Sequence, residues 1–198
     1  EGEILVVTAD NKGVSMRRPA EQLPAGCHRK KGEKANKKQM AAVGCVYTVD
    51  PKLRTPEEVV AALFRERPCR KGEAESEPVA QSKRLWSSLS YEWEGKDYDG
   101  EENVFGWMAQ EVSARLKKDQ AIVCVMDGQR SLWGVLKEFI PHENLVEILD
   151  LLHVAPRLWE AAHLFHAEGS DKAVDFVRER MLRVLRGEAG YVIGGLRQ

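Results

Sequence analysis

Three apolar runs mark the chain as one with buried strands. They cover 3–9, 39–49 and 120–126, and the middle run, QMAAVGCVYTV, is apolar almost throughout. Short apolar runs bounded by polar residues are typical of strands buried inside a sheet. A fourth run, LVEIL at 145–149, predicts another strand.

Polar residues separate the first two runs and predict how they connect. Residues 10–13, DNKG, predict a tight turn in which Gly13 supplies a positive φ, and 14–17 then predict a returning strand. A polar, basic loop at 18–38 leads to the run at 39–49. The first three strands are therefore expected to form an antiparallel meander.

Helical patterns alternate with the later strands. Thr55, Pro56 and Glu58 predict a capped helix start at TPEEVVAALFRER. Residues 103–118 place apolar side chains at helical spacing, and further helices are expected over GQRSLWGVLKEFI, APRLWEAAHLFHAEG and SDKAVDFVRERMLRVLRG. A short helix is also expected at SKRLWSSLS.

This order of elements predicts an α/β fold with a ribonuclease-H-like mixed sheet. A three-strand antiparallel meander is followed by two parallel strands, and helices flank the sheet. One domain is expected over 1–198, with a flexible connector at about 66–103 and the start of a helical insertion at about 154–198. The C-terminal part of the domain is expected to lie beyond the chain.

Charge is nearly balanced overall but unevenly distributed. The net charge of −1 excludes a globally basic DNA-coating protein, and no apolar run is long enough for a membrane span or resembles a signal peptide, which favours a cytoplasmic protein. Residues 90–103 are acidic, whereas a basic stretch is a candidate for contacts with DNA phosphates, the alternative being a solvated loop. The candidate DNA-binding residues are Arg29, Lys30, Lys31, Lys34, Lys37 and Lys38.

Two buried-strand patterns end on a carboxylate. Asp10 follows the first run and Asp127 follows the run at 120–126, so they end the first and fourth predicted strands, which lie side by side in a ribonuclease-H-like sheet. Neighbouring carboxylates persist together when a cation lies between them, and Mg²⁺ or Mn²⁺ prefers such hard oxygen ligands. A two-metal site for phosphodiester chemistry is therefore predicted. The alternatives are a turn residue at Asp10 and a helix cap at Asp127.

Other candidate ligands favour ordinary structural roles. Cys45 and Cys124 lie inside apolar runs and are expected to be reduced core residues, while a zinc site using Cys27 and His28 lacks a partner pair at ligand spacing. His163 and His166 share a helix face, where exposed histidines are the main expectation and zinc the alternative. The tryptophans of the predicted helices, Trp133 among them, are expected to pack in the core, with base stacking as the alternative.

Several segments, in order, resemble transposases of bacterial insertion sequences of the ISKra type. They are VVTADNKGVSMRR, KKGEKANKKQMAAVGCVYTVDP, RTPEEVVAALF, CVMDGQRSLW, ILDLLHVAPRLWEAAHLFH and GYVIGGLRQ. The resemblance implies a DDE transposase with Asp10 and Asp127 as its first two catalytic acids. It also implies a D-x-x-H element, formed here by Asp150 and His153. The family's third acid, a Glu, would lie beyond residue 198, and Glu160, on a predicted exposed helix face, is the alternative within the chain.

The resemblance implies transposition by metal-dependent cleavage and strand transfer. The expected partners are double-stranded DNA, both element ends and target, and further copies of the chain in a homo-oligomer on DNA. Because the third acid is expected outside the chain, this piece alone is expected to be inactive. Two alternatives remain: a nuclease or resolvase of the same fold, and a non-catalytic, DNA-binding remnant of a transposase.

Overall fold

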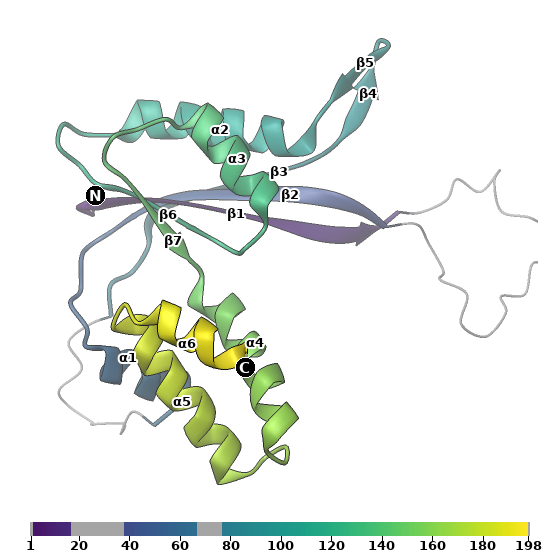
Figure 1. Cartoon of the computed structure of the whole chain (residues 1–198). Helices are drawn as coiled ribbons and strands as arrows, with labels where there is room; N and C mark the ends of the chain where they lie inside the picture. Colours follow the sequence, from purple (N-terminus) through teal and green to yellow (C-terminus); the bar gives the residue numbers. More distant parts are fainter. Residues whose placement is uncertain (1, 17–37, 67–76, 198) are drawn as a thin grey trace, which may run out of the picture. The chain divides into compact units, whose positions relative to one another are not determined.

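A computed structural model describes residues 2–16, 38–66 and 77–197 (Figure 1). The chain divides into two compact units. The first unit combines Glu1–Val49 with Ala80–Ile148, and the second combines Asp50–Val79 with Leu149–Gln198. The single domain expected from the sequence is therefore organised as two units, each built from two separate stretches of chain.

The first unit contains a five-stranded mixed sheet. Its strands are β1 (Ile4–Ser15), β2 (Lys38–Val49), β3 (Gln81–Leu89), β6 (Ile122–Met126) and β7 (Leu145–Leu149). They lie in the order β3-β2-β1-β6-β7, with β1–β2 and β2–β3 antiparallel and β1–β6 parallel. The predicted α/β class with a mixed sheet is confirmed. An antiparallel meander is present, but it consists of β1, β2 and β3 and not of the predicted strands at 3–9, 14–17 and 39–49.

The predicted turn at 10–13 is wrong. Strand β1 continues through these residues to Ser15 and pairs with β2 along its whole length, from Ile4↔Val49 to Ser15↔Lys38. Gly13 does not adopt the positive φ that the turn required. The long partner strand satisfies the backbone polar groups of 10–15, so the chain has no need to reverse there.

The helix expected at SKRLWSSLS is also wrong, because this segment is β3. Most of its side chains are exposed, so its residue pattern does not report the pairing with β2 that makes it a strand. The connector expected at about 66–103 is wrong over its described part. That part holds β3, a hairpin of β4 (Tyr91–Trp93) and β5 (Lys96–Tyr98), and the start of α2 (Gly100–Arg115).

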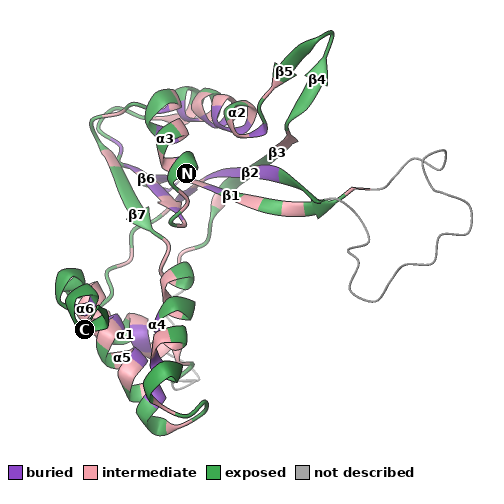
Figure 2. Cartoon of the chain, turned by 45° about the vertical axis from the view of Figure 1, so that its right-hand side comes forward, coloured by how far each residue is buried: buried purple, intermediate pink, exposed green. Residues whose placement is uncertain are grey.

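Two helices cover one face of the sheet, as Figure 2 shows by burial. Helices α2 and α3 (Arg130–Phe139) pack Phe105, Met108 and Leu132 against alternate residues of the central strands. The approach is close at Gly44 of β2, where an added Cβ would lie 2.6 Å from Cγ1 of Val104. The helix and the sheet are therefore in direct contact beside the centre of the sheet.

The second unit is helical and has its own core. It contains α1 (Pro56–Leu63), α4 (Leu151–Phe165), α5 (Asp171–Leu185) and α6 (Ala189–Leu196). The capping box predicted for Thr55 and Glu58 is present at the start of α1. The core residues are Val60, Leu158, Ala162, Ala173, Val177, Met181 and Val192. Helices α4, α5 and α6 thus cover most of 154–198 and share this unit with α1, while the assignment of 154–198 to a helical insertion stays a prediction.

Ion pairs join α1 and the residues after it to α5. Glu57 accepts a hydrogen bond from Arg186 at 2.5 Å, which lowers the pKa of the Glu57 carboxyl, and Glu66 pairs with Arg178.

Throughout the three described ranges, no helix combines the length and the apolar character needed to cross a bilayer.

Candidate functional site

The two predicted acids each directly follow the last paired residue of two adjacent strands. Strands β1 and β6 run parallel, from the pair Leu5↔Ile122 to the pair Ala9↔Met126. Asp10, still within β1, follows Ala9, and Asp127, the first residue after β6, follows Met126. Neighbouring strands are about 4.8 Å apart, so the backbones of the two acids leave the buried part of the sheet side by side.

Asp10 ends the buried part of β1, not the strand itself. Leu5, Val7 and Ala9 are buried, and Asp10 is the first exposed residue of the strand. Since β6 stops at Met126, β1 beyond this point has its ladder with β2 on one side and no paired residue of β6 on the other. The change from apolar to polar residues follows from this loss of a neighbouring strand.

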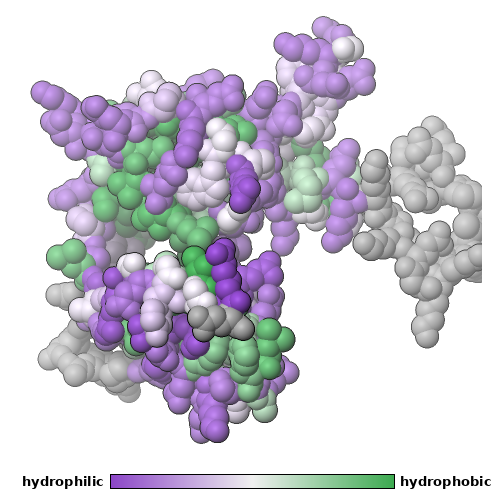
Figure 3. All heavy atoms as spheres, viewed as in Figure 1, coloured by the Kyte–Doolittle hydropathy of each residue, from purple (hydrophilic) through white to green (hydrophobic). Residues whose placement is uncertain are grey.

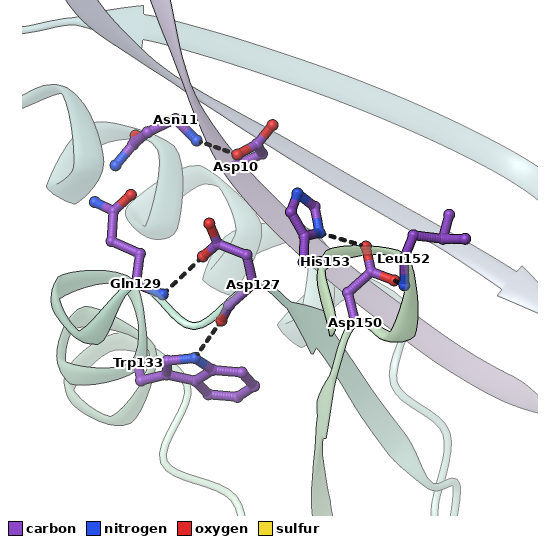
Figure 4. Close-up of polar contacts among 8 residues, drawn as sticks. All are labelled: Asp10, Asn11, Asp127, Gln129, Trp133, Asp150, Leu152 and His153. Carbon is purple, nitrogen blue, oxygen red and sulfur yellow. Dashed lines mark hydrogen bonds and ion pairs between the residues drawn. The ribbon is translucent and has the colours of Figure 1, made fainter. Parts of the chain in front are cut away.

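Asp127 is held at both its side chain and its main chain (Figure 4). Its Oδ1 accepts a hydrogen bond of 2.8 Å from the backbone N–H of Gln129, and its carbonyl oxygen accepts one of 2.7 Å from Nε1 of Trp133. The N-cap of α3 is Gln129, which makes no side-chain capping bond. Asp127 thus stabilises the turn that leads into α3. This role is similar to the helix cap that the sequence analysis gave as the alternative for Asp127.

Each acid keeps one carboxylate oxygen available for a ligand. Oδ1 of Asp10 accepts a hydrogen bond of 2.8 Å from the backbone N–H of Asn11, as Oδ1 of Asp127 does from Gln129. Neither Oδ2 has a hydrogen-bond partner within the described ranges. Two neighbouring carboxylates with free oxygens fit the preference of Mg²⁺ or Mn²⁺ for oxygen ligands.

A third metal ligand is not gathered beside this pair in the described part of the chain. There, no three His, Cys, Asp or Glu side chains form a group that could hold a metal ion. Glu160 lies in the second unit, exposed on α4 and paired with Arg157 at 2.9 Å. Its exposed position agrees with the sequence analysis.

A carboxylate that sequence reasoning missed contacts residues adjacent to the two acids. Oε1 of Glu101, in the first turn of α2, accepts hydrogen bonds of 2.6 Å from Asn11, 3.2 Å from Gln129 and 3.3 Å from Ser131. The sequence analysis placed Glu101 in an acidic connector. Asp99 before an amphipathic segment was a local signal for a helix start, but nothing local indicated contact with Asn11.

The D-x-x-H element belongs to the second unit and forms the start of α4. Asp150 is its N-cap: Oδ1 accepts a hydrogen bond of 2.9 Å from the backbone N–H of Leu152, and Oδ2 lies 2.8 Å from Nδ1 of His153. The structure therefore gives Asp150 and His153 a local role in capping.

Most of the predicted basic stretch lies outside the described residues. This applies to Arg29, Lys30, Lys31, Lys34 and Lys37. Lys38 is described; it is exposed at the start of β2 and pairs with Ser15. A role in DNA binding stays a prediction for all six residues.

The remaining candidates take structural roles where they are described. Cys45 and Cys124 are buried free thiols, as predicted, and burial raises the pKa of Cys124 to about 12. Trp133 packs against the core of the first unit, also as predicted. His163 and His166 contact the rings of Trp159 and Phe176, respectively. Cys27, the zinc alternative, lies outside the described residues.

Comparisons with protein-family models, with curated proteins and with solved structures find no match. The class of site is therefore defined by its own chemistry. It is a pair of carboxylates that directly follow the last paired residues of two neighbouring parallel strands, each held by one backbone N–H and each with one oxygen free.

Proposed function

We propose that the first unit is a ribonuclease-H-like catalytic core in which Asp10 and Asp127 hold Mg²⁺ or Mn²⁺ for phosphodiester chemistry on DNA. The observation that carries the proposal is the parallel pair Ala9↔Met126, since each acid directly follows one of its members. The strand order, with an antiparallel meander beside a parallel strand, supports the fold assignment.

The residues around the two acids suit such a site. Backbone N–H groups of Asn11 and Gln129 orient the carboxylates, and the free oxygens are the ones that would bind. When bound, a pair of divalent ions activates the attacking oxygen of a phosphodiester reaction and stabilises the leaving oxygen. The attacking oxygen belongs to water in strand cleavage and to a DNA 3′-hydroxyl in strand transfer.

DNA transposition is the reaction that we favour, on paired element ends and target DNA and with more than one copy of the chain. A nuclease or resolvase of the same fold would cut DNA without joining it. A non-catalytic DNA-binding remnant is favoured by one observation, namely that no third ligand accompanies the two acids within the described ranges. The proposal therefore separates metal binding, which two acids can provide, from strand cleavage, which requires more.

Metal binding is tested by titrating the 198-residue chain with Mn²⁺ and following the signal of free Mn²⁺ by electron paramagnetic resonance. We expect weak binding that Asp10→Asn and Asp127→Asn each reduce by at least about 10-fold, an effect typical of losing even an outer partner of a metal site. Asp119→Asn is the matched control, because Asp119 is exposed and its φ of 61° suits Asn. Equal affinity in all four proteins would rule out the two-acid site.

Cleavage is tested with supercoiled plasmid and Mn²⁺. With two gathered acids, we expect the chain alone to produce no detectable nicking. Nicking that disappears in both Asp10→Asn and Glu160→Gln would instead assign the third acid to Glu160. Nicking that survives Asp10→Asn would rule out the proposed site.

DNA binding is tested by the salt dependence of affinity. Replacing Lys30, Lys31, Lys37 and Lys38 by Ala should reduce the slope of log K against log salt, by up to about 0.9 for each phosphate that the chain no longer neutralises. The matched control replaces four acidic residues of the hairpin and of α2, Glu92, Glu94, Asp97 and Glu102, by Gln or Asn. An unchanged slope in the lysine variant would mean that this stretch does not bind DNA.

A further inference from the structure

Glu101 connects the two sides of the candidate site through a single oxygen. Its Oε1 accepts hydrogen bonds from side chains that are adjacent to the acids but are not the acids themselves. Asn11 is the residue after Asp10. Gln129 is the residue whose backbone N–H binds Oδ1 of Asp127. A continuous set of hydrogen bonds and backbone links therefore joins Asp10 to Asp127 by way of Glu101.

The hydrogen bonds to Oε1 of Glu101 are strong enough to fix the positions of their donors. Hydrogen bonds to an ionised carboxylate are shorter and about twice as strong as those between neutral groups. The distance between Asn11 Nδ2 and Glu101 Oε1 is 2.6 Å. Ser131, also bonded to Gln129 at 2.7 Å, adds a third donor to the same oxygen. This oxygen therefore has three protein partners and is engaged in the network.

The backbone that carries Glu101 is itself fixed to the sheet. Asp99 caps α2 by accepting from the backbone N–H groups of Glu101 and Glu102, at 2.8 and 3.1 Å. The N–H of Gly100 donates to Oγ of Ser90, and an added Cβ at Gly100 would lie 2.9 Å from the carbonyl carbon of Leu89. The first turn of α2 is thus packed directly on the end of β3.

We propose that Glu101 is a positioning residue that sets the separation of Asp10 and Asp127, through Asn11 on one strand and Gln129 on the other. The inference rests on the proposed function, since it matters only if the two acids share a metal. Because the network fixes the residues beside both acids, the two carboxylates have their separation set before an ion binds. Loss of such outer support typically reduces metal affinity by about 10–100-fold.

The test is the same Mn²⁺ titration, applied to variants of the network. Glu101→Ala should lower affinity by about 10-fold, and Glu101→Gln should lower it less, because the amide oxygen still accepts. Asn11→Ala and Gln129→Ala should each reproduce part of the loss. Glu102→Ala is the matched control, since Glu102 is the next residue in the same helical turn and is exposed; its affinity should equal that of the unchanged chain.

A purely structural effect is separated by a core variant of the same helix. Val112 is buried on α2, away from the helix start, so Val112→Ala should lower the melting temperature without lowering Mn²⁺ affinity. If Val112→Ala and Glu101→Ala lose affinity in the same proportion to their loss of melting temperature, positioning is overturned.

Three results distinguish the possible failures. If Asp10→Asn reduces affinity and Glu101→Ala does not, positioning is overturned and the two-acid site stands. If Asp10→Asn has no effect, the proposed function fails, and the positioning role with it. If Glu101→Gln costs as much affinity as Asp10→Asn while Asn11→Ala and Gln129→Ala cost none, Glu101 is a direct ligand and positioning is overturned.

Discussion

The indole Nε1 of Trp133 donates a hydrogen bond of 2.7 Å to the main-chain carbonyl of Asp127. Trp133 lies on α3 and packs against the core of the first unit, so the bond attaches the residue after β6 to the helix that follows it. The carboxylate of Asp127 is fixed separately, by the N–H of Gln129. Backbone and side chain of this acid are thus held by different residues of one turn and helix.

Trp133→Phe should therefore destabilise the chain and also weaken Mn²⁺ binding. The ring is kept in part, but the carbonyl of Asp127 loses its donor, which costs about 1–3 kcal/mol for a desolvated group. Urea denaturation followed by circular dichroism measures the first effect, and the Mn²⁺ titration measures the second.

Trp107→Phe is the matched control for this change. Trp107 is also partly buried in the first unit and stacks on Trp86 at 6.1 Å, but its indole N–H makes no hydrogen bond within the described ranges. Trp107→Phe should therefore lower the free energy of unfolding by about 1 kcal/mol less than Trp133→Phe does, which is the net value of a typical hydrogen bond. Equal losses in both variants would mean that the bond to Asp127 contributes nothing.

Gly44→Ala should destabilise the first unit by about 1–3 kcal/mol, as is usual for overpacking a core. The new methyl group would lie 2.6 Å from Val104 and 2.9 Å from Met108, so α2 has to move away from the sheet. Gly134→Ala provides the contrast. It lies on α3 with open space around it, and should stabilise by about 0.5–1 kcal/mol. Urea denaturation measures both, and a stable Gly44→Ala protein would contradict the close packing of α2.

Cys124 should resist alkylation by iodoacetamide in the folded chain at pH 8. Burial raises its pKa to about 12, so only about one thiol in ten thousand is the reactive thiolate at that pH. Mass spectrometry of the peptide should show label at Cys124 in urea and almost none without it. Rapid labelling of the folded chain would show that β6 is accessible.

The raised pKa of Cys124 also predicts how its thiol affects the free energy of unfolding at high pH. The folded chain keeps the proton that the unfolded chain releases above the ordinary value of 9.0. The contribution of Cys124 to stability is therefore complete below pH 9 and falls as the pH rises from about 9 to about 12. Cys124→Ala should show a shallower fall over this range.

Asp150→Ala should cost about 1 kcal/mol, the usual effect of removing an N-cap. Asp150→Ser should restore most of this, since Ser can accept from Leu152 as Asp150 does. His153→Ala should cost less than about 1 kcal/mol, because the side chain of His153 is 52% exposed. Urea denaturation compares the three. If Asp150→Ser is as unstable as Asp150→Ala, the role of this acid is not capping.

Local patterns predicted the parts of the fold that depend on local physics. The buried runs at 3–9, 39–49 and 120–126 are strands, and the capping box at Thr55 starts a helix. The turn at 10–13 was predicted from residue types alone, whereas a partner strand that extends to Lys38 decides the conformation of these residues. Strand β3 was missed for the same reason, as its exposed side chains carry no periodic signal.

In the candidate site, too, local sequence predicts some residues and not others. Asp10 and Asp127 are found by reading where an apolar run stops, which needs no knowledge of the partner strand. The role of Glu101 depends on the chain after β3 making the β4–β5 hairpin and returning to the sheet at α2. In Figure 3 this hairpin is a mostly hydrophilic projection. The residues near Glu101 in the sequence give no indication that Glu101 contacts Asn11, which is far away along the chain.

The two-stretch construction of the second unit sets an order for folding during synthesis. Helix α1 ends at Leu63, but α5, its partner in the helical core, begins at Asp171. At about 5–20 residues per second, α1 waits on the order of 10 s for that partner to be made. During this interval Val60 has no α5 to pack against. The second unit is thus the later of the two units to close, and a pause in translation before Asp171 would lengthen the period in which the apolar face of α1 stays exposed.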